Sequence, residues 1–304
     1  MGPRQEPLSD ALSDALAEVR SSVVHLRQPK DLEGWHVVAR AAKERILSRR
    51  RQDLTPQDLH DYVEDGPNEL PLPEAQWFLP ALCEHIVRGE HCRGALGWSF
   101  ALSLLQRSGF PERWPDRPVA AVRAFVAALV TDYLEHPDAW SAAFADDLRG
   151  PGLPVFLSMA DEGCVGVEAV FAGAEAAPEA ARAREIARWT VGNYAAPYAA
   201  QGQPGFEAVA EYLAADTFVS PKAMDVTKCW LVLQEPWVMI PRALERETEP
   251  EWQDVLDEAA TLWAAAARDG REGRAVSPWR SRSRYLRRYR QKRRRRSGRG
   301  PTTG

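Results

Sequence analysis

The residues best suited to chemistry with a partner lie near the C-terminus, where arginines crowd together. The twenty residues from Arg280 to Arg299 contain 12 Lys and Arg and no Asp or Glu. A guanidinium donates two parallel hydrogen bonds to a phosphate and keeps its charge at every physiological pH. Such contacts release counterions, so they give affinity that is sensitive to salt and independent of sequence. This composition therefore predicts a phosphate-binding segment.

Two tyrosines extend that prediction from phosphate to nucleic acid. Tyr285 and Tyr289 stand four residues apart among the arginines, and aromatic rings next to a cationic groove stack on unpaired bases. We expect contacts with nucleic acid, without sequence preference, from Arg280, Arg282, Arg284, Tyr285, Arg287, Arg288, Tyr289, Arg290, Lys292, Arg293, Arg294, Arg295, Arg296 and Arg299.

Three other interpretations of this segment stay open. Lys292–Arg296 has the composition of a nuclear import signal, which would apply in a eukaryotic host. The cations would also be drawn to an anionic membrane, although the segment lacks an apolar face for insertion. Finally, the segment would be attracted to acidic protein surface, including that of its own chain.

The charge of the chain is strongly polarised. The formal net charge is −4, from 39 Lys and Arg against 43 Asp and Glu. Residues 276–304, the tail, hold 12 of these cations and none of the acids. Residues 1–275, the body, therefore carry a net formal charge of −16, from 27 cations and 43 acids. A tail with so little apolar area cannot offset the entropy of ordering, so it is predicted to be disordered.

A second cluster of chemically active residues lies near the middle of the first half. Cys83, His85, His91 and Cys92 have the side chains that bind zinc. Their spacing fits none of the common zinc patterns, and one helix would point Cys83 and His85 about 200° apart. We therefore assign no metal or other cofactor, and expect a buried cysteine with surface histidines. A zinc protein or enzyme built on this cluster stays open as an alternative.

Motifs and composition give little support to an enzyme. The sequence contains no phosphate-binding loop, dinucleotide fingerprint, zinc protease motif or nucleophile elbow. Four cysteines are too few for a disulfide scaffold and suit a reducing compartment. No apolar run is long enough for a membrane span, and the N-terminus lacks the pattern of a signal peptide. We expect an intracellular protein, cytoplasmic or, in a eukaryote, nuclear.

Amphipathic helices must build the body. Apolar residues recur at spacings of three and four, which predicts helices over 7–28, 31–50, 119–134, 179–194 and 248–270, and a buried helical hairpin over 77–105. Thr55 and Thr248 are expected to cap helices. The runs Val155–Met159 and Val165–Phe171 contain valines suited to strands, but their alanine-rich and glutamate-rich surroundings favour helix.

These patterns predict an all-α protein, a multi-helix orthogonal bundle of about ten helices with a disordered Arg-rich C-terminal tail. Gly150-Pro151-Gly152 marks the predicted boundary between a helical domain at 1–150 and a second helical subdomain at 151–275. The tail occupies 276–304.

Two short stretches resemble known families. Trp77-Phe78-Leu79-Pro80 is similar to a signature of uncharacterised helical bacterial proteins, which implies no function. Gln201-Gly202 with Phe206 and Val209 resembles the major homology region of retroviral capsid proteins, as does the layout of a body with a basic tail. However, Gly205 stands where that motif has a glutamate, and no zinc knuckle follows. We assign the chain to neither family.

The sequence thus leads to a non-enzymatic helical protein whose tail binds nucleic acid or another polyanion. Its body would make contacts with a protein partner or with further copies of itself, as a packaging protein does. The alternative is a protein-interaction scaffold whose tail is a localisation signal or binds an acidic protein.

Overall fold

The described residues form an all-helical protein. The structure, a computed structural model, describes residues 7–33, 40–88, 98–141, 152–198, 210, 213–214 and 220–272. Within these ranges there are helices and loops but no strand, which confirms the predicted fold class. The helices are α1 Asp10–Ser22, α2 Arg40–Leu47, the short 3-10 helix η2 Arg51–Asp53, α3 Pro56–Asp65, α4 Leu72–Val87, α5 Trp98–Arg107, α6 Asp116–Glu135, α7 Pro137–Ser141, α8 Gly152–Glu162, α9 Val167–Ala176, α10 Glu179–Tyr198, α12 Pro221–Leu233, α13 Pro236–Leu244 and α14 Pro250–Glu272.

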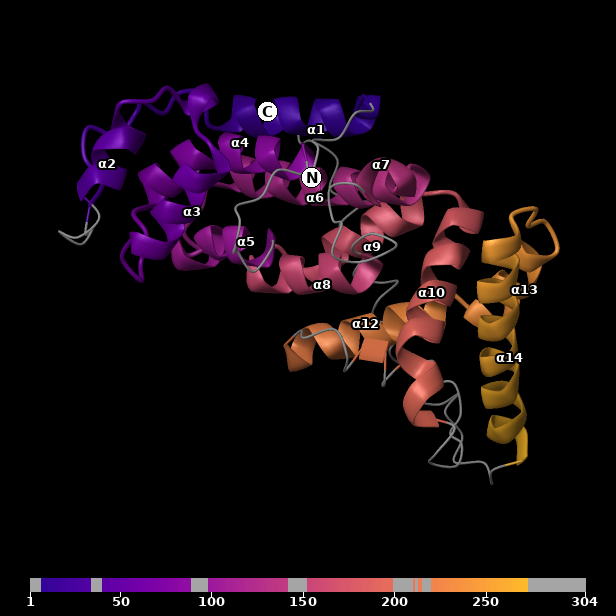
Figure 1. The fold of residues 1–304 in the computed structure, drawn as a ribbon. Helices are drawn as coiled ribbons and strands as arrows, with labels where there is room; N and C mark the ends of the chain where they lie inside the picture. The colour runs from indigo at the N-terminus through magenta and orange to yellow at the C-terminus, as the bar shows by residue number, and fades with distance from the viewer. Residues whose placement is uncertain are drawn as a thin grey trace, which may run out of the picture.

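The helices are arranged in two directions (Figure 1). Helices α1, α4, α6 and α8 run along the longer part of the molecule, with α2 and α3 at one end. Helices α10, α13 and α14 stand across that direction at the opposite end, and α12 lies below α9. This crossing agrees with the predicted orthogonal arrangement.

Local sequence explains where several helices begin. The side chain of Thr55 accepts a hydrogen bond from the backbone N of Asp58, and the carboxylate of Asp58 accepts one from the backbone N of Thr55, which forms a complete capping box. Ser9 and Ser220 cap α1 and α12 in the same manner. The expected cap at Thr55 is therefore confirmed.

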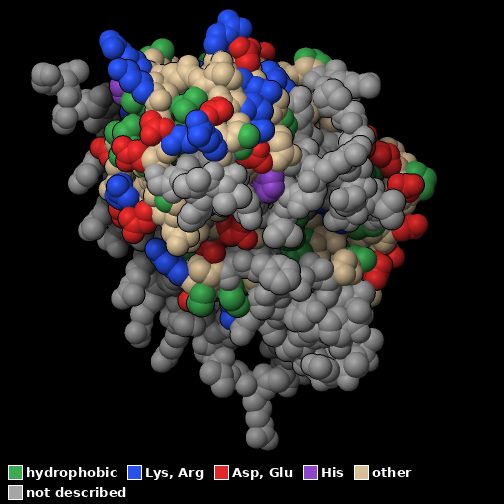
Figure 2. Space-filling model, turned by 60° about the vertical axis from the view of Figure 1, so that its left-hand side comes forward, with side chains coloured by type: hydrophobic (Ala, Val, Ile, Leu, Met, Phe, Trp, Pro, Cys, Tyr) green, Lys and Arg blue, Asp and Glu red, His purple; other side chains and the backbone are tan. Residues whose placement is uncertain are grey.

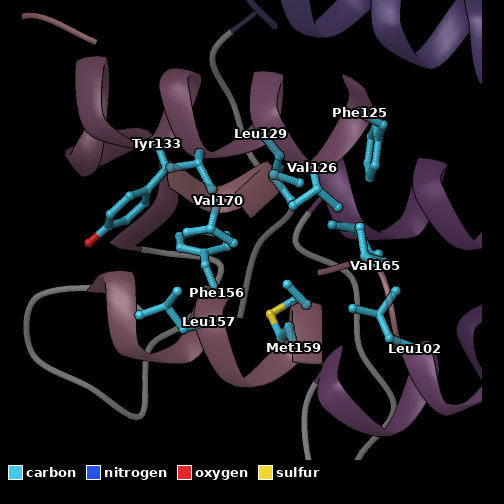
Figure 3. Close-up of a cluster of buried hydrophobic side chains, with 14 of the residues drawn as sticks. Leu102, Phe125, Val126, Leu129, Tyr133, Phe156, Leu157, Met159, Val165 and Val170 are labelled. Carbon is cyan, nitrogen blue, oxygen red and sulfur yellow. The ribbon is translucent and has the colours of Figure 1, made fainter. Parts of the chain in front are cut away.

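The central core lies between α5, α6, α8 and α9 (Figure 3). Val170 of α9 lies beside Phe156 of α8, and Tyr133 of α6 packs against the same ring, with 5.1 Å between the ring centroids. Gly173 allows α6 and α9 to approach closely, because a Cβ at this position would lie 2.2 Å from the backbone oxygen of Ala127. This contact explains why α9 carries a glycine in a helical position, where its conformational entropy is otherwise unfavourable.

Two polar side chains, one buried and one partly buried, join elements distant in the chain. Asp132 of α6 accepts hydrogen bonds from the backbone N of Ser9 and from the indole of Trp140. Arg107, at the end of α5, donates to the carbonyl oxygens of Val63, Gly66 and Pro67 after α3. These bonds satisfy backbone groups left over at helix ends.

Some predicted elements differ from the observed ones. Helix α1 ends at Ser22 rather than at residue 28. Of the helix predicted over 31–50, α2 covers Arg40–Leu47, and residues 34–39 lie outside the described residues. Helix α14 begins at Pro250, and the carbonyl oxygen of Glu249 accepts from the backbone N of Trp252 and Gln253, so Glu249 rather than Thr248 holds the cap position. Helix α14 continues past Gly270 to Glu272, so Gly270 does not end it.

Both ambiguous runs are helical, in α8 and α9. Between α12 and α13, Glu235 has a φ of 50°, while Pro241 lies inside α13. Helices from both sides of residue 150 pack together, α5 with α8 and α6 with α9. Packing within one chain does not test whether each part folds alone, so the domain boundary stays a prediction. No helix among the described residues is long and apolar enough to cross a bilayer.

Candidate nucleic-acid interface

The predicted interface is carried by the last described helix. Helix α14 packs against α10 and α13 through Leu256, Ala259 and Trp263, all fully buried. It leads to residue 272, eight residues before the first tail arginine. All fourteen predicted nucleic-acid-binding residues, Arg280 to Arg299, lie outside the described residues, so their contacts with nucleic acid stay a prediction.

The exposed side of α14 is acidic. Glu251, Asp254, Asp257 and Glu258 are exposed there, and Glu249 is exposed just before the helix begins. Residues 247–264 contain no Lys or Arg. The acidic part of the predicted separation of charge is thus present on the described surface of α14.

The cations of α2 and η2 face a different environment, because most of them are paired with acids. Asp58 is fully buried, and its carboxylate lies 2.8 Å from Arg45 Nε and 2.5 Å from Arg49 Nη1. Burial raises the pKa of Asp58, but hydrogen bonds from Arg45 and Thr55 outweigh this, so the pKa lies below its usual range. The same hydrogen bond to Asp58 raises the pKa of Arg45.

The outer cations of this region form one-to-one pairs. Arg40 pairs with Glu44 at 2.8 Å, Lys43 with Asp31 at 2.5 Å and Arg50 with Asp53 at 2.6 Å. Figure 2 shows this end of the molecule, where blue cationic and red acidic side chains alternate near the top of the view. A phosphate would have to displace a carboxylate at each of these cations, so they are poor sites for a polyanion.

Two buried polar networks contain residue types that also occur in catalytic sites. Glu74 accepts hydrogen bonds from the Tyr62 hydroxyl at 3.1 Å and from the backbone N of Glu33 at 2.9 Å. Burial raises the pKa of Glu74 and also that of Tyr62, which the neighbouring Glu74 charge raises further. The pair ties the loop at residues 31–33 to α3 and α4, a structural task.

The second network joins α6, α8 and α10. Glu185 accepts hydrogen bonds from Arg188 at 2.7 Å and from Leu153 N at 2.9 Å, while Arg188 also donates to the Tyr133 hydroxyl at 2.8 Å. Burial raises the pKa of the Tyr133 hydroxyl, so this group stays protonated. Sequence analysis missed this network, although the spacing of three between Glu185 and Arg188 is that of a helical ion pair.

The zinc alternative rested on Cys83, His85, His91 and Cys92, of which the last two lie outside the described residues. Cys83 is buried, as expected, and burial raises the pKa of its thiol, which disfavours the thiolate that binds metal. His85 was expected at the surface, but it is buried, with Nε2 2.8 Å from the carbonyl oxygen of Leu54. Packing of α4 against η2 explains the difference. No cluster of three potential metal ligands exists among the described residues.

Comparisons with known proteins add no relative: no protein-family model, curated protein or solved structure matches this chain. Its function must be argued from its own residues.

Proposed function

We propose that the protein binds nucleic acid without sequence preference through the cations of its C-terminal tail, while the helical body makes protein contacts or assembles with further copies of itself. The tail supplies 12 cations within twenty residues and no acid. Binding by such a segment is driven by release of counterions from phosphates, which needs no folded pocket.

The acidic charge of the body supports this proposal, because it disfavours binding of a polyanion anywhere except at the tail. A net formal charge of −16 on residues 1–275 repels nucleic acid in general, so phosphates are directed to the tail. The exposed acids of α14 place such a repulsive surface directly before the tail. The proposal therefore expects one end of the chain to hold the nucleic acid while much of the body stays free for protein contacts.

The buried polar groups of the body support the role of a scaffold. Asp58 holds two arginines, Glu74 holds a loop, and Glu185 holds the backbone at the start of α8. Each of these groups thus joins helices and loops to one another.

Fluorescence anisotropy with two labelled oligonucleotides of unrelated sequence tests the proposal. We expect the full chain to bind both with similar affinity, and a chain that ends at Arg274 to bind neither at physiological salt. Circular dichroism and thermal unfolding of the shortened chain check that its body is folded. Strong preference for one sequence, or equal binding by both chains, would reject the proposal.

The acidic face of α14 favours one second function, a protein-interaction scaffold whose tail contacts acidic protein surface. In this case Glu251, Asp254, Asp257 and Glu258 would be occupied by the tail of the same or another chain. The same experiment separates the two functions, because a tail engaged only with protein leaves the full chain unable to bind either oligonucleotide.

A further inference from the structure

The outer side of α14, at the edge of the molecule in Figure 1, carries four exposed acids. Leu256, Ala259 and Trp263 form the inner side, which packs against α10 and α13. Because each residue turns a helix by about 100°, the acids lie together on the side opposite these apolar residues. We call the four acids the α14 stripe: Glu251, Asp254, Asp257 and Glu258.

The α14 stripe is not neutralised by the residues that the structure describes. None of its four carboxylates forms an ion pair or a hydrogen bond with a described side chain. Residues 247–264 contain no Lys or Arg, and like charges three or four positions apart on a helix repel one another. A cationic segment that lay along the stripe would relieve this repulsion.

The acidic surface at the start of the same helix already binds an arginine. Arg184 of α10 donates two hydrogen bonds to the carboxylate of Glu247, at 2.7 and 2.6 Å, and a third to Glu249, at 2.9 Å. Its guanidinium lies over the ring of Trp252, 5.3 Å from the centroid. The α14 stripe continues from this site for about two turns, where no arginine of the described residues reaches it. The observed site thus indicates the ligand that the stripe lacks.

The cationic segment nearest to the stripe is the tail of the same chain. Helix α14 ends at Glu272, and the first tail arginine, Arg280, follows eight residues later. Eight residues of chain span at most about 26–29 Å, whereas Glu258 lies only about 21 Å before the end of the helix. The tail is therefore long enough to turn back along α14. Its tether also gives it an effective concentration in the millimolar range, which favours it over a separate partner.

From this arrangement we infer that the α14 stripe is a docking site for the arginines of the chain's own tail, and that it competes with nucleic acid for them. The inference rests on the proposed function and adds its regulation. Four carboxylates neutralise only part of the 12 tail cations, so the others stay available for a first contact with phosphate. Exposed ion pairs are weak individually, so a nucleic acid displaces them once it has bound.

The test compares two variants of the full chain whose net charge changes equally. The stripe variant carries Glu251→Gln, Asp254→Asn, Asp257→Asn and Glu258→Gln. The control variant changes four exposed acids elsewhere on the body that form no ion pair with a described residue: Asp14→Asn, Glu69→Gln, Glu112→Gln and Glu135→Gln. The affinity of each chain for a labelled oligothymidylate is measured by anisotropy at about 100 mM salt, where contacts between charges are only partly screened. Thermal unfolding checks that both variants are folded.

The stripe variant should bind the oligonucleotide roughly threefold to tenfold more tightly than the wild-type chain, because phosphates no longer compete with docked carboxylates. The control variant should differ from the wild-type chain by less than about twofold, since it alters the general charge of the body and no docking contact.

A second measurement detects the contact itself. Arg282→Lys and Arg284→Lys place amines in the tail and keep its charge, and a carbodiimide joins an amine to a carboxylate that it touches. Mass spectrometry should find these lysines linked to acids of the α14 stripe, in a product with the mass of one chain. An excess of oligothymidylate should suppress the link.

Equal affinities of the stripe and control variants would overturn the inference but leave the proposed function intact, since the tail would then bind phosphates without a competitor. Links found only in products that contain two chains would overturn docking within one chain. Absence of oligonucleotide binding by the wild-type chain and by both variants would reject the proposed function, and the competition with it.

Discussion

At the scale of single residues, carboxylates decide how the cations of this protein behave. Asp58 is fully buried and pairs with Arg45 and Arg49, whereas Glu84 pairs with two arginines that are each about half exposed. Arginines of similar sequence context therefore differ in how accessible their charge is to a binding partner. In the folded body, the availability of an arginine to an anion depends on the acids near its guanidinium more than on the number of arginines beside it in the sequence.

Asp58 offers a test of the buried ion pairs. Asp58→Asn removes the charge that holds Arg45 and Arg49, and we expect it to lower the free energy of unfolding at pH 7 by about 1–3 kcal/mol. Since the folded-state pKa of Asp58 is lowered, its contribution is present above the usual pKa, about 3.9, and is lost as the pH falls. Urea unfolding at pH 7 and at pH 3 measures the difference.

Asp53→Asn is the control for this prediction, because Asp53 belongs to an exposed pair with Arg50. Its effect should stay below about 0.5 kcal/mol. An Asp58→Asn effect that is the same at both pH values would contradict the assigned role.

Glu74 should show the opposite dependence on pH. Burial raises its folded-state pKa, so the native protein binds more protons than the unfolded chain above the usual glutamate pKa of about 4.3. The stability of the wild-type protein relative to Glu74→Gln should therefore fall as the pH rises from this value towards neutrality. Thermal unfolding of both proteins across this range provides the measurement, with Glu44→Gln as an exposed control. A difference that grows in favour of the wild-type protein with rising pH would disprove the assignment.

At the scale of helices, contact between α6 and α9 limits what the core tolerates. Gly173→Ala would place a Cβ 2.2 Å from the oxygen of Ala127 and 2.9 Å from Cβ of Val130. The two helices must separate to accept it, so we expect a loss of about 1–3 kcal/mol in chemical denaturation.

Gly192 of α10 provides the matched control, since a Cβ there meets no atom within 4 Å. Gly192→Ala should stabilise the protein by roughly 0.5–1 kcal/mol, because alanine favours helix. If Gly173→Ala left the free energy of unfolding unchanged, α6 and α9 would not pack as closely as described.

The sequence predicted the helices well where periodicity and caps agreed. Thr55 with Pro56 and Asp58 located α3, and the stripe around Phe125 located α6. Prediction failed at Thr248, because Glu249, one residue later, holds the cap position of α14. His85 was misplaced for a related reason: its burial depends on the distant Leu54 carbonyl, which no local pattern reveals.

The candidate site was less predictable than the fold. Composition alone identified the tail, since a run of arginines needs no tertiary structure to be recognised. Glu84 of α4 pairs with Arg20 only because α1 packs on α4, while its pair with Arg88 is local to the end of α4. The spacing of four between Glu84 and Arg88 is visible in the sequence, whereas the contact of Arg20 with Glu84 is not.

At the scale of the whole molecule, opposite charges are separated along one chain. The body carries a net formal charge of −16 and the tail +12, so an overall charge of −4 hides both. Such a molecule is drawn to a polyanion by one segment and repelled by most of the rest. This separation is the basis of the proposed function.

The most direct test of that function is the salt dependence of nucleic-acid binding by the full chain. If the tail neutralises at least six phosphates, log K for single-stranded DNA should fall against log salt with a slope of about −4 or steeper. Replacing the 12 tail cations with glutamine should remove nearly all of this dependence. A shallow slope for the wild-type chain, or a slope that survives this replacement, would contradict the central claim that the tail holds the phosphates.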